Sequence, residues 1–345
     1  MADALDFSAS AEQLQPLLQA AVSEFIGELA TIDKLRQLTA GAAAQTWRFI
    51  AHGKAGKRTL ILRRGVDADQ FAGALGQADE ARVIAAAVAG CVSAPEVIGV
   101  LTERHGLGEG FVMSCIDGET LPPKILKDPR YEDARSKLAQ HCGESLAQIH
   151  AVPRDQVSHL AVSGLGGQLD FYEQSYRKFD YPLPVFDAAF QLLRRKVNDY
   201  ELDDPALTLV HGDFRNGNLI VGEEGLRAVL DWELAHIGDP MEDLGWLCVN
   251  SWRFSKRDKP VGGFGDRQSL FDAYQAASGK PVDPNRVAVW ELFGVLKWGV
   301  ICLYQCHVHL EGLLPSVERA SIGRRVSECE LDIVDLIETG GELWR

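Results

Sequence analysis

The sequence is short of positive charge. Its 345 residues include 35 Lys and Arg against 49 Asp and Glu, which gives a formal net charge of -14. A protein that binds nucleic acid needs a basic surface for the phosphate backbone. This composition therefore argues against a nucleic-acid partner.

A long uncharged hydrophobic run is also missing. The most apolar long segment, 287–306, still contains Glu291 and Lys297, so it predicts a buried core helix and no membrane span. The N-terminal sequence MADALDFSASAEQLQ is polar and acidic and lacks the pattern of a secretory signal. We expect neither membrane insertion nor secretion.

Cysteine is present without the pattern of a disulfide framework. The seven cysteines are scattered and odd in number, which is typical of reduced thiols and favours a cytoplasmic location. Cys302 and Cys306, with His307 and His309 close by, could suggest a metal site. No second cluster of ligands completes a metal site, so we expect these side chains to lie on the core-facing side of this helix.

Strand patterns come early in the chain and helical patterns come late. Apolar residues recur at helical spacing over 11–29. The first third then shows strand-like segments at 35–39, 46–51 and 58–64, a helix at 78–89, and two further strands in APEVIGVLTE and GFVMSCI. Longer helices are predicted at 132–151, 171–199 and 286–311. This order favours an α+β, two-lobed architecture, with the polar, proline-rich segment 114–123 at the boundary.

The stretch LVHGDFRNGNLIV, residues 209–221, places polar side chains between two apolar segments. Asp213 and Asn218 lie five positions apart on this loop, and the strand LRAVLDW then delivers Asp231. Phosphoryl transfer needs a carboxylate to orient and deprotonate the attacking hydroxyl, and oxygen ligands for Mg²⁺ on the nucleotide. Asp213 suits the first task, and Asn218 and Asp231 suit the second.

Neighbouring polar residues have two interpretations each. Arg215 could stabilise charge on the transferred phosphoryl group, which we favour, or pair with a loop carboxylate. His211 could act as a catalytic acid–base, but we expect it to brace the loop. Asp239 and Asp243 could be metal ligands, but we expect Asp239, beside Pro240, to cap a helix and Asp243 to be structural. For Glu233, a place in the outer shell of the metal and a purely structural role are equally supported by the sequence.

The motif HGDFRNGN followed by LDWE resembles the catalytic loop and metal-binding motif of the aminoglycoside phosphotransferase and choline kinase family. The resemblance extends over about residues 35–310, and HGDFRNGN with LRRG is more similar to the branch related to acyl-CoA metabolism. It implies a protein-kinase-like fold with a small antiparallel-sheet N-lobe and a larger, mostly helical C-lobe. ATP would be the co-substrate and Mg²⁺ the cofactor.

The resemblance also implies a domain layout. Residues 1–33 would form an N-terminal helical extension, residues 34–115 the nucleotide-binding N-lobe, and residues 116–345 the C-lobe with the catalytic loop and the acceptor-binding helices.

Further roles follow from the resemblance, position by position. The phosphate-holding lysine of the family would fall at Arg63, with Glu80 as its ion-pair partner, and Gly41 would belong to the glycine-rich loop. Backbone groups of Ser114, Cys115 and Ile116 would meet the purine, with Met113 at the back of that pocket. Two departures stand out, namely arginine in place of lysine and a loop, LTAGAAAQTW, that retains only Gly41.

The acceptor is expected to be a small hydroxylated molecule. Only seven residues separate Asp231 from Asp239, which leaves no room for a long segment to hold a peptide substrate. The stretch WRFSKRDKP, 252–260, is either a solvated loop or an anion-steering patch for an acidic or phosphorylated acceptor. The resemblance to the acyl-CoA-related branch implies a hydroxyacyl acceptor. The tryptophans of this half could line a cation–π pocket, so a choline-like cation is an alternative acceptor.

A kinase is the favoured function, and a non-catalytic nucleotide-binding pseudokinase or regulatory protein is the alternative. A homodimer stays open.

Overall fold

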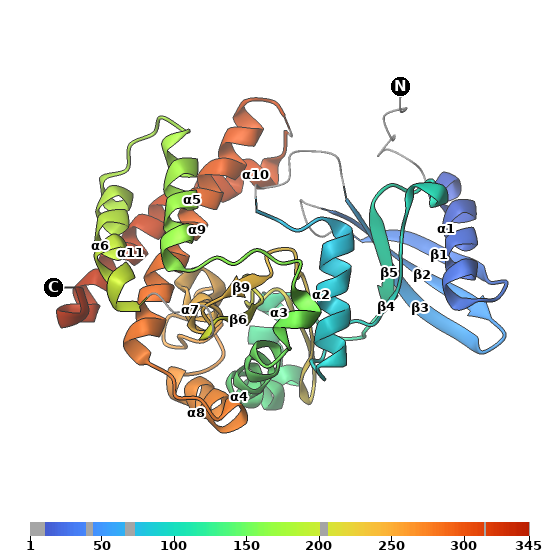
Figure 1. The fold of residues 1–345 in the computed structure, drawn as a ribbon, viewed down its shortest axis with the longest axis horizontal. Helices are drawn as coiled ribbons and strands as arrows, with labels where there is room; N and C mark the ends of the chain where they lie inside the picture. The colour runs from blue at the N-terminus through green and yellow to red at the C-terminus, as the bar shows by residue number, and fades with distance from the viewer. Residues whose placement is uncertain (1–10, 39–43, 66–72, 201–205, 314, 345) are drawn as a thin grey trace. The chain divides into compact units, whose positions relative to one another are not determined.

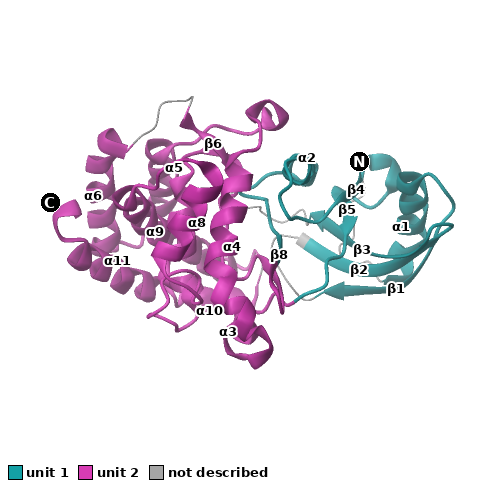
Figure 2. Ribbon diagram, turned by 90° about the horizontal axis from the view of Figure 1, so that it is seen from below, with its two compact units in different colours: residues 1–118, 227–235 teal, residues 119–226, 236–345 magenta. Residues whose placement is uncertain are grey.

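The computed structural model describes residues 11–38, 44–65, 73–200, 206–313 and 315–344. The chain forms two compact units, which Figure 2 colours separately. Unit 1 contains the described residues up to Gly118 together with Arg227–Ala235. Unit 2 contains the described residues of Glu119–Leu226 and those from His236 onward.

Unit 1 is built on one antiparallel sheet of five strands in the order β1-β2-β3-β5-β4 (Figure 1). Its elements are α1 (Ala11–Ile26), β1 (Thr31–Leu38), β2 (Ala44–Gly53), β3 (Gly56–Gly65), α2 (Gln77–Ala89), β4 (Val97–Val100) and β5 (Gly110–Ser114). β2 and β3 pair as far as Gly53 and Gly56, and Gly56 supplies the positive φ of 109° at their turn.

The helix α1 packs its apolar stripe on this sheet. Leu14, Leu18 and Val22 join Phe49 and Leu62 in one buried cluster. The helical pattern predicted over 11–29 ends earlier, at Ile26, because Gly27 adopts a positive φ of 70°. As a result, Leu29 is 92% exposed and does not belong to the buried stripe.

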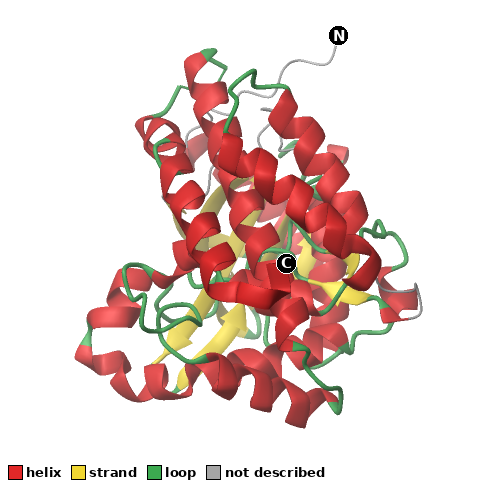
Figure 3. Ribbon diagram, turned by 90° about the vertical axis from the view of Figure 1, so that its left-hand side faces the viewer, coloured by secondary structure: helices red, strands yellow, loops and turns green. Residues whose placement is uncertain are grey.

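Unit 2 is mostly helical (Figure 3). Its helices are α3 (Pro122–Lys127), α4 (Glu132–His150), α5 (Leu165–Arg177), α6 (Pro184–Tyr200), α7 (Met241–Cys248), α8 (Arg267–Ser278), α9 (Pro284–Leu310), α10 (Val317–Gly323) and α11 (Val326–Gly340). Short strands lie between α6 and α7, namely β6 (Thr208–Val210), β7 (Leu219–Gly222), β8 (Gly225–Val229, in which the unit boundary falls) and β9 (His236–Gly238). The small antiparallel sheet and the mostly helical remainder confirm the predicted fold class.

The single helix predicted over 171–199 was wrong, because the structure has two helices there. α5 ends at Arg177 and α6 begins at Pro184. Pro182 and Pro184 explain the break, since proline lacks the backbone N–H and disfavours helical geometry at the residue before it.

The long apolar helix α9 lies in the core of unit 2. By length and composition it could cross a membrane, but 78% of its most apolar 18-residue window is buried in the protein. Asp283 caps it by accepting hydrogen bonds from the N–H groups of Asn285 and Arg286. Cys302 is buried in this helix, and over the described ranges no group of three or more His, Cys, Asp or Glu side chains is arranged to hold a metal ion.

Candidate active site

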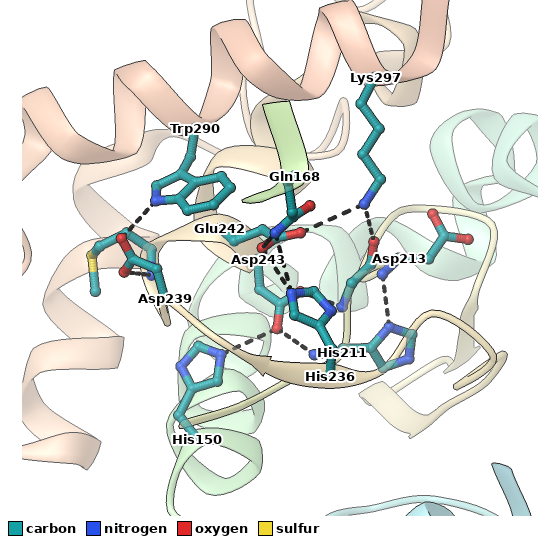
Figure 4. A network of polar contacts seen from close by, with 12 residues as sticks. His150, Gln168, His211, Asp213, His236, Asp239, Glu242, Asp243, Trp290 and Lys297 are labelled. Atoms are coloured by element: carbon teal, nitrogen blue, oxygen red, sulfur yellow. Dashed lines mark hydrogen bonds and ion pairs between the residues drawn. The ribbon is translucent and has the colours of Figure 1, made fainter. Parts of the chain in front are cut away.

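The loop between β6 and β7, in unit 2, carries the polar residues of HGDFRNGN. Its backbone is held from α7, because Asp243 accepts hydrogen bonds from the N–H groups of His211 (2.8 Å) and Gly212 (3.0 Å). The N–H of Asp213 donates to Nδ1 of His211 at 3.1 Å, which confirms that His211 braces the loop. Figure 4 shows these contacts from close by. The loop is therefore fixed immediately before Asp213.

Asp243 is itself buried, and its surroundings stabilise the ionised carboxylate. Its Oδ2 lies 3.1 Å from Nε2 of His150, whose Nδ1 lies 2.9 Å from the hydroxyl of Tyr274. Burial acts to raise the pKa of Asp243, but the hydrogen bond and charge of His150 and the loop N–H groups outweigh it and lower the pKa below its ordinary value. Asp243 is thus a structural anion, as expected.

Asp239 is a second structural carboxylate. It accepts a hydrogen bond from the N–H of Met241, at the start of α7, as its expected capping role requires. Its other oxygen accepts from Nε of Arg286 at 2.5 Å and from the indole of Trp290 at 2.6 Å. These bonds tie the N-terminal end of α7 to α9.

The carboxylate of Asp213 is oriented by three side chains. Nδ2 of Asn218 donates to its Oδ2 at 2.6 Å, and the indole of Trp246 donates to its Oδ1 at 2.8 Å. Nε of Arg215 donates to both oxygens, at 3.0 and 3.1 Å. Asp213 is 9% exposed, so it lies just below the surface with a fixed direction. Such a carboxylate can accept a hydrogen bond from a hydroxyl and then its proton.

Arg215 makes the carboxylate pair that was one of its two interpretations, and its action on a transferred phosphoryl group stays a prediction. It pairs with the loop carboxylate of Asp213, and its guanidinium also stacks on Trp252, 4.6 Å from the ring centroid. This cation–π contact helps to hold the guanidinium beside Asp213. Trp246 and Trp252 are both buried, and they contact the side chains of Asp213 and Arg215, respectively. Trp246 lies in GDPMEDLGW, but nothing in that pattern shows its hydrogen bond to Asp213.

In unit 1, Arg63 on β3 faces three carboxylates. Its Nε lies 3.2 Å from Oε2 of Glu80 on α2, which is the predicted ion pair. Its Nη2 donates to Oδ1 of Asp231 at 2.7 Å and to Oε2 of Glu233 at 2.8 Å. Asp231 adopts a left-handed φ of 67°, which is uncommon for a residue other than glycine and is often found at functional sites.

The charges in this cluster perturb each other. Burial opposes the charge on Arg63, but Glu80, Asp231 and Glu233 outweigh burial and raise the pKa of the guanidinium further. For Glu80, burial raises the pKa to about 7 against the opposing effect of Arg63. One cation shared among three carboxylates leaves an excess of negative charge, and this excess suits a divalent cation.

The residues predicted to meet the purine lie at the end of β5. Met113 pairs with Ile61, and Ser114 pairs with Leu60. The N–H of Ser114 donates to the carbonyl of Glu96, and that of Cys115 donates to the carbonyl of Thr59. These two N–H groups are therefore engaged in the sheet, and contact with a purine would fall to carbonyl groups and to Ile116. Gly41 lies outside the described residues.

The predicted metal ligands fit a hard cation by their chemistry. The amide nitrogen of Asn218 is used by Asp213, with bonds to its carbonyl at 3.0 Å and its carboxylate at 2.6 Å, so the amide oxygen is the atom to offer to a metal. Asp231 offers a carboxylate that is 28% exposed. Asn218 belongs to unit 2 and Asp231 to unit 1.

Several solved structures share the fold of this chain, and their names are those of phosphotransferases and kinases. A Ralstonia eutropha protein assigned as an aminoglycoside phosphotransferase is 19% identical, with a TM-score of 0.73 over 94% of this chain and 98% of that one. A choline/ethanolamine kinase family protein from Mesorhizobium loti is 20% identical, with a TM-score of 0.60 over 89% and 88%. Spectinomycin phosphotransferase, solved with ADP and spectinomycin, is 12% identical, with a TM-score of 0.60 over 97% and 98%. At these identities the likeness establishes the fold.

Sequence comparison gives the family. Mouse acyl-CoA dehydrogenase family member 10 is 28% identical over 204 residues, which are 56% of this chain and 18% of that protein. The chain thus spans less than a fifth of this relative. The similarity itself agrees with the resemblance to the acyl-CoA-related branch. Residues 34–279 match the model of the phosphotransferase enzyme family. This match extends over more than half of the chain, and the chain therefore belongs to the phosphotransferase enzyme family.

Proposed function

We propose that this protein transfers the γ-phosphate of ATP, with Mg²⁺, to a hydroxyl group of a small molecule. The observation that carries the proposal is the carboxylate of Asp213, which Asn218, Trp246 and Arg215 hold in one direction. Asp213 orients the acceptor hydroxyl and accepts its proton as the new oxygen–phosphorus bond forms. The bond between the γ-phosphorus and its bridging oxygen breaks, and ADP leaves.

The remaining site residues take supporting roles in this proposal. Asn218 and Asp231 would hold Mg²⁺, which neutralises charge on the phosphates when bound. Arg63 would bind phosphate oxygens, and Arg215 would stabilise the charge on the transferred group. Backbone groups of Ser114, Cys115 and Ile116 would meet the purine, with Met113 at the back of that pocket. The seven cysteines are all free thiols, and we propose a cytoplasmic location on that basis.

For the acceptor, we propose an acidic or hydroxyacyl molecule. Two tryptophan rings of this half already carry a cation, since Arg215 lies 4.6 Å from the ring centroid of Trp252 and Arg325 lies 5.8 Å from that of Trp298. A choline-like ammonium would meet like charge there, which disfavours it. The similarity to an acyl-CoA dehydrogenase family member supports a hydroxyacyl acceptor.

The basic stretch 252–260 supports anion steering less than its composition suggests. Arg253 is held by Glu291 at 2.8 Å, and Arg257 lies 3.6 Å from Asp332. Lys256 and Lys259 are exposed and are the cations left to act on a ligand from this stretch.

One observation favours the alternative of a regulatory protein without catalysis. Arg63 pairs directly with Asp231, so the predicted metal ligand is engaged by a cation. The two functions differ in turnover, because a pseudokinase would bind nucleotide without releasing ADP.

The test combines binding with two variants. Mg²⁺ and ATP at 100 times Kd should stabilise the wild type by about 2.7 kcal/mol in thermal melts, and ATP alone by less. Asp213→Asn should keep this shift and lower ADP release, with a panel of hydroxylated acids as acceptors, by roughly 10²- to 10⁴-fold. Asp231→Asn should lose much of the shift because a metal ligand is gone. If Mg²⁺ and ATP produce no shift, the nucleotide site is refuted, and binding without any turnover would favour the regulatory alternative.

A further inference from the structure

Lys297 is a charged residue in the middle of the apolar helix α9. Its side chain is buried, with the residue 3% exposed. A buried ammonium is costly unless it is paired and hydrogen-bonded. Its Nζ donates to the carbonyl of Gly212 at 3.1 Å and lies 3.5 Å from Oε1 of Glu242, and Figure 4 labels Lys297 and Glu242. The same Nζ lies 4.8 Å from the ring centroid of Trp246. Lys297 therefore reaches the loop that carries the candidate base.

The surroundings keep Lys297 charged. Burial opposes the charge, but Tyr172 on α5, Glu242 and Asp243 on α7, and Asp213 on the loop outweigh it and raise the pKa of Lys297. The partner Glu242 does not depend on Lys297 alone. Its Oε2 accepts from Nε2 of Gln168 at 2.6 Å and lies 3.1 Å from Nε2 of His236.

The contact with Gly212 completes the anchoring of the peptide before Asp213. That peptide has its carbonyl bonded to Lys297 and its N–H bonded to His211. The preceding N–H, that of Gly212, is bonded to Asp243, and Gly212 itself adopts a positive φ of 78°. An anion on one side of Gly212 and a cation on the other hold it in a conformation that favours glycine.

We propose that Lys297 is a positioning residue for phosphoryl transfer, which fixes the peptide between Gly212 and Asp213 and thereby the direction of the Asp213 carboxylate. The inference rests on the proposed function of Asp213. A residue that served only the core ion pair would need only Glu242, yet the shortest polar contact of Lys297 is to the loop. Its hydrogen bond is charge-assisted and therefore stronger than a neutral one.

The experiment compares Lys297→Met with Lys297→Arg, which keeps the charge, and with the double variant Lys297→Met, Glu242→Gln. The double variant removes both charges, so no unpaired buried carboxylate endangers folding. The control is Arg267→Met, which breaks an ion pair to Glu291 of the same helix at 2.6 Å. The readouts are amide hydrogen exchange of residues 209–214 by mass spectrometry and ADP release from Mg²⁺ and ATP with water as acceptor.

In Lys297→Met and the double variant, exchange at 209–214 should become roughly 10 to 100 times faster, as expected from the loss of a hydrogen bond to a charged group. Turnover should fall by about the same factor while KM for ATP stays within about twofold, and Lys297→Arg should restore much of both. Arg267→Met should lower Tm and leave exchange at 209–214 unchanged.

Wild-type exchange at 209–214 in the double variant overturns the proposal. A wild type that neither binds ATP nor releases ADP refutes the proposed function instead, and the exchange result still decides whether Lys297 anchors the loop.

Discussion

Arg63 is surrounded by more negative charge than one guanidinium can neutralise. Glu80, Asp231 and Glu233 all lie within 3.2 Å of its nitrogens. Glu80 is 1% exposed, and its carboxylate also accepts a hydrogen bond from the backbone N–H of Trp232. Burial, and to a lesser degree the charge of Asp231, raise the pKa of Glu80 to about 7 against the opposing effect of Arg63. We therefore expect the stability of the protein to depend on pH between about 4.5 and 7 because of Glu80.

Replacing Glu80 with Gln should remove that dependence. A raised pKa in the folded state contributes stability that is fully present below the unfolded value of 4.5 and is lost as the pH rises through about 7. The wild type should therefore lose stability relative to Glu80→Gln between pH 4.5 and 7, by at most about 3 kcal/mol. Urea unfolding of both proteins at several pH values, without nucleotide, measures the difference. A difference that stays constant with pH would show that Glu80 is ionised throughout.

At the scale of elements, glycines set how closely helices approach in unit 2. A Cβ atom on Gly143 of α4 would lie 2.5 Å from the carbonyl oxygen of Leu270 on α8. No side chain fits there without moving the two helices apart. Gly167 in α5 differs, because the nearest atom to its Cβ position, Oγ of Ser163, is 3.8 Å away.

These two glycines form a matched pair for mutation. Gly143→Ala should destabilise the protein by about 1–3 kcal/mol through overpacking. Gly167→Ala should be neutral or stabilise by up to about 1 kcal/mol, because alanine favours a helix more than glycine does. Chemical denaturation measures both changes. Equal effects of the two substitutions would mean that the α4–α8 contact adjusts to the added methyl group.

Elements with a strong periodic pattern could be predicted from the sequence. The β2–β3 hairpin follows from alternation bounded by Gly53 and Gly56, and the fold class follows from strands early and helices late. The interruption between α5 and α6 could have been read from Pro182 and Pro184, but the helical spacing on both sides hid it. The contacts of Trp246 with Asp213 and of Lys297 with Gly212 could not be predicted, since they depend on how α7 and α9 pack in three dimensions.

At the scale of the whole molecule, unit 1 is not continuous in sequence. Residues 227–235 belong to it and bring Asp231 and Glu233 to Arg63. The N–H of Val229 also donates to the carbonyl of Ser93 at 2.8 Å. Unit 1 therefore lacks part of its own structure until the chain returns from unit 2.

This discontinuity can be tested with fragments. Residues 11–118 alone should be less stable than the same residues joined to 227–235 by a flexible linker, because Arg63 then regains two of its three carboxylates. Thermal melts by circular dichroism compare the two. The control is the joined fragment with Asp231→Ala and Glu233→Ala. If both fragments melt at the same temperature, residues 227–235 add nothing to the stability of unit 1.

The returning segment also has a consequence during translation. Asp231 and Glu233 follow Arg63 by 168 and 170 residues, whereas Glu80 follows it closely. Ribosomes add about 5–20 residues per second, so roughly 10–30 s separate the synthesis of Arg63 from that of its two later partners. The nascent chain thus passes through a stage in which the first sheet is complete and its arginine is only partly paired. A chaperone that shields this sheet on the ribosome would have to stay until residue 235 has emerged.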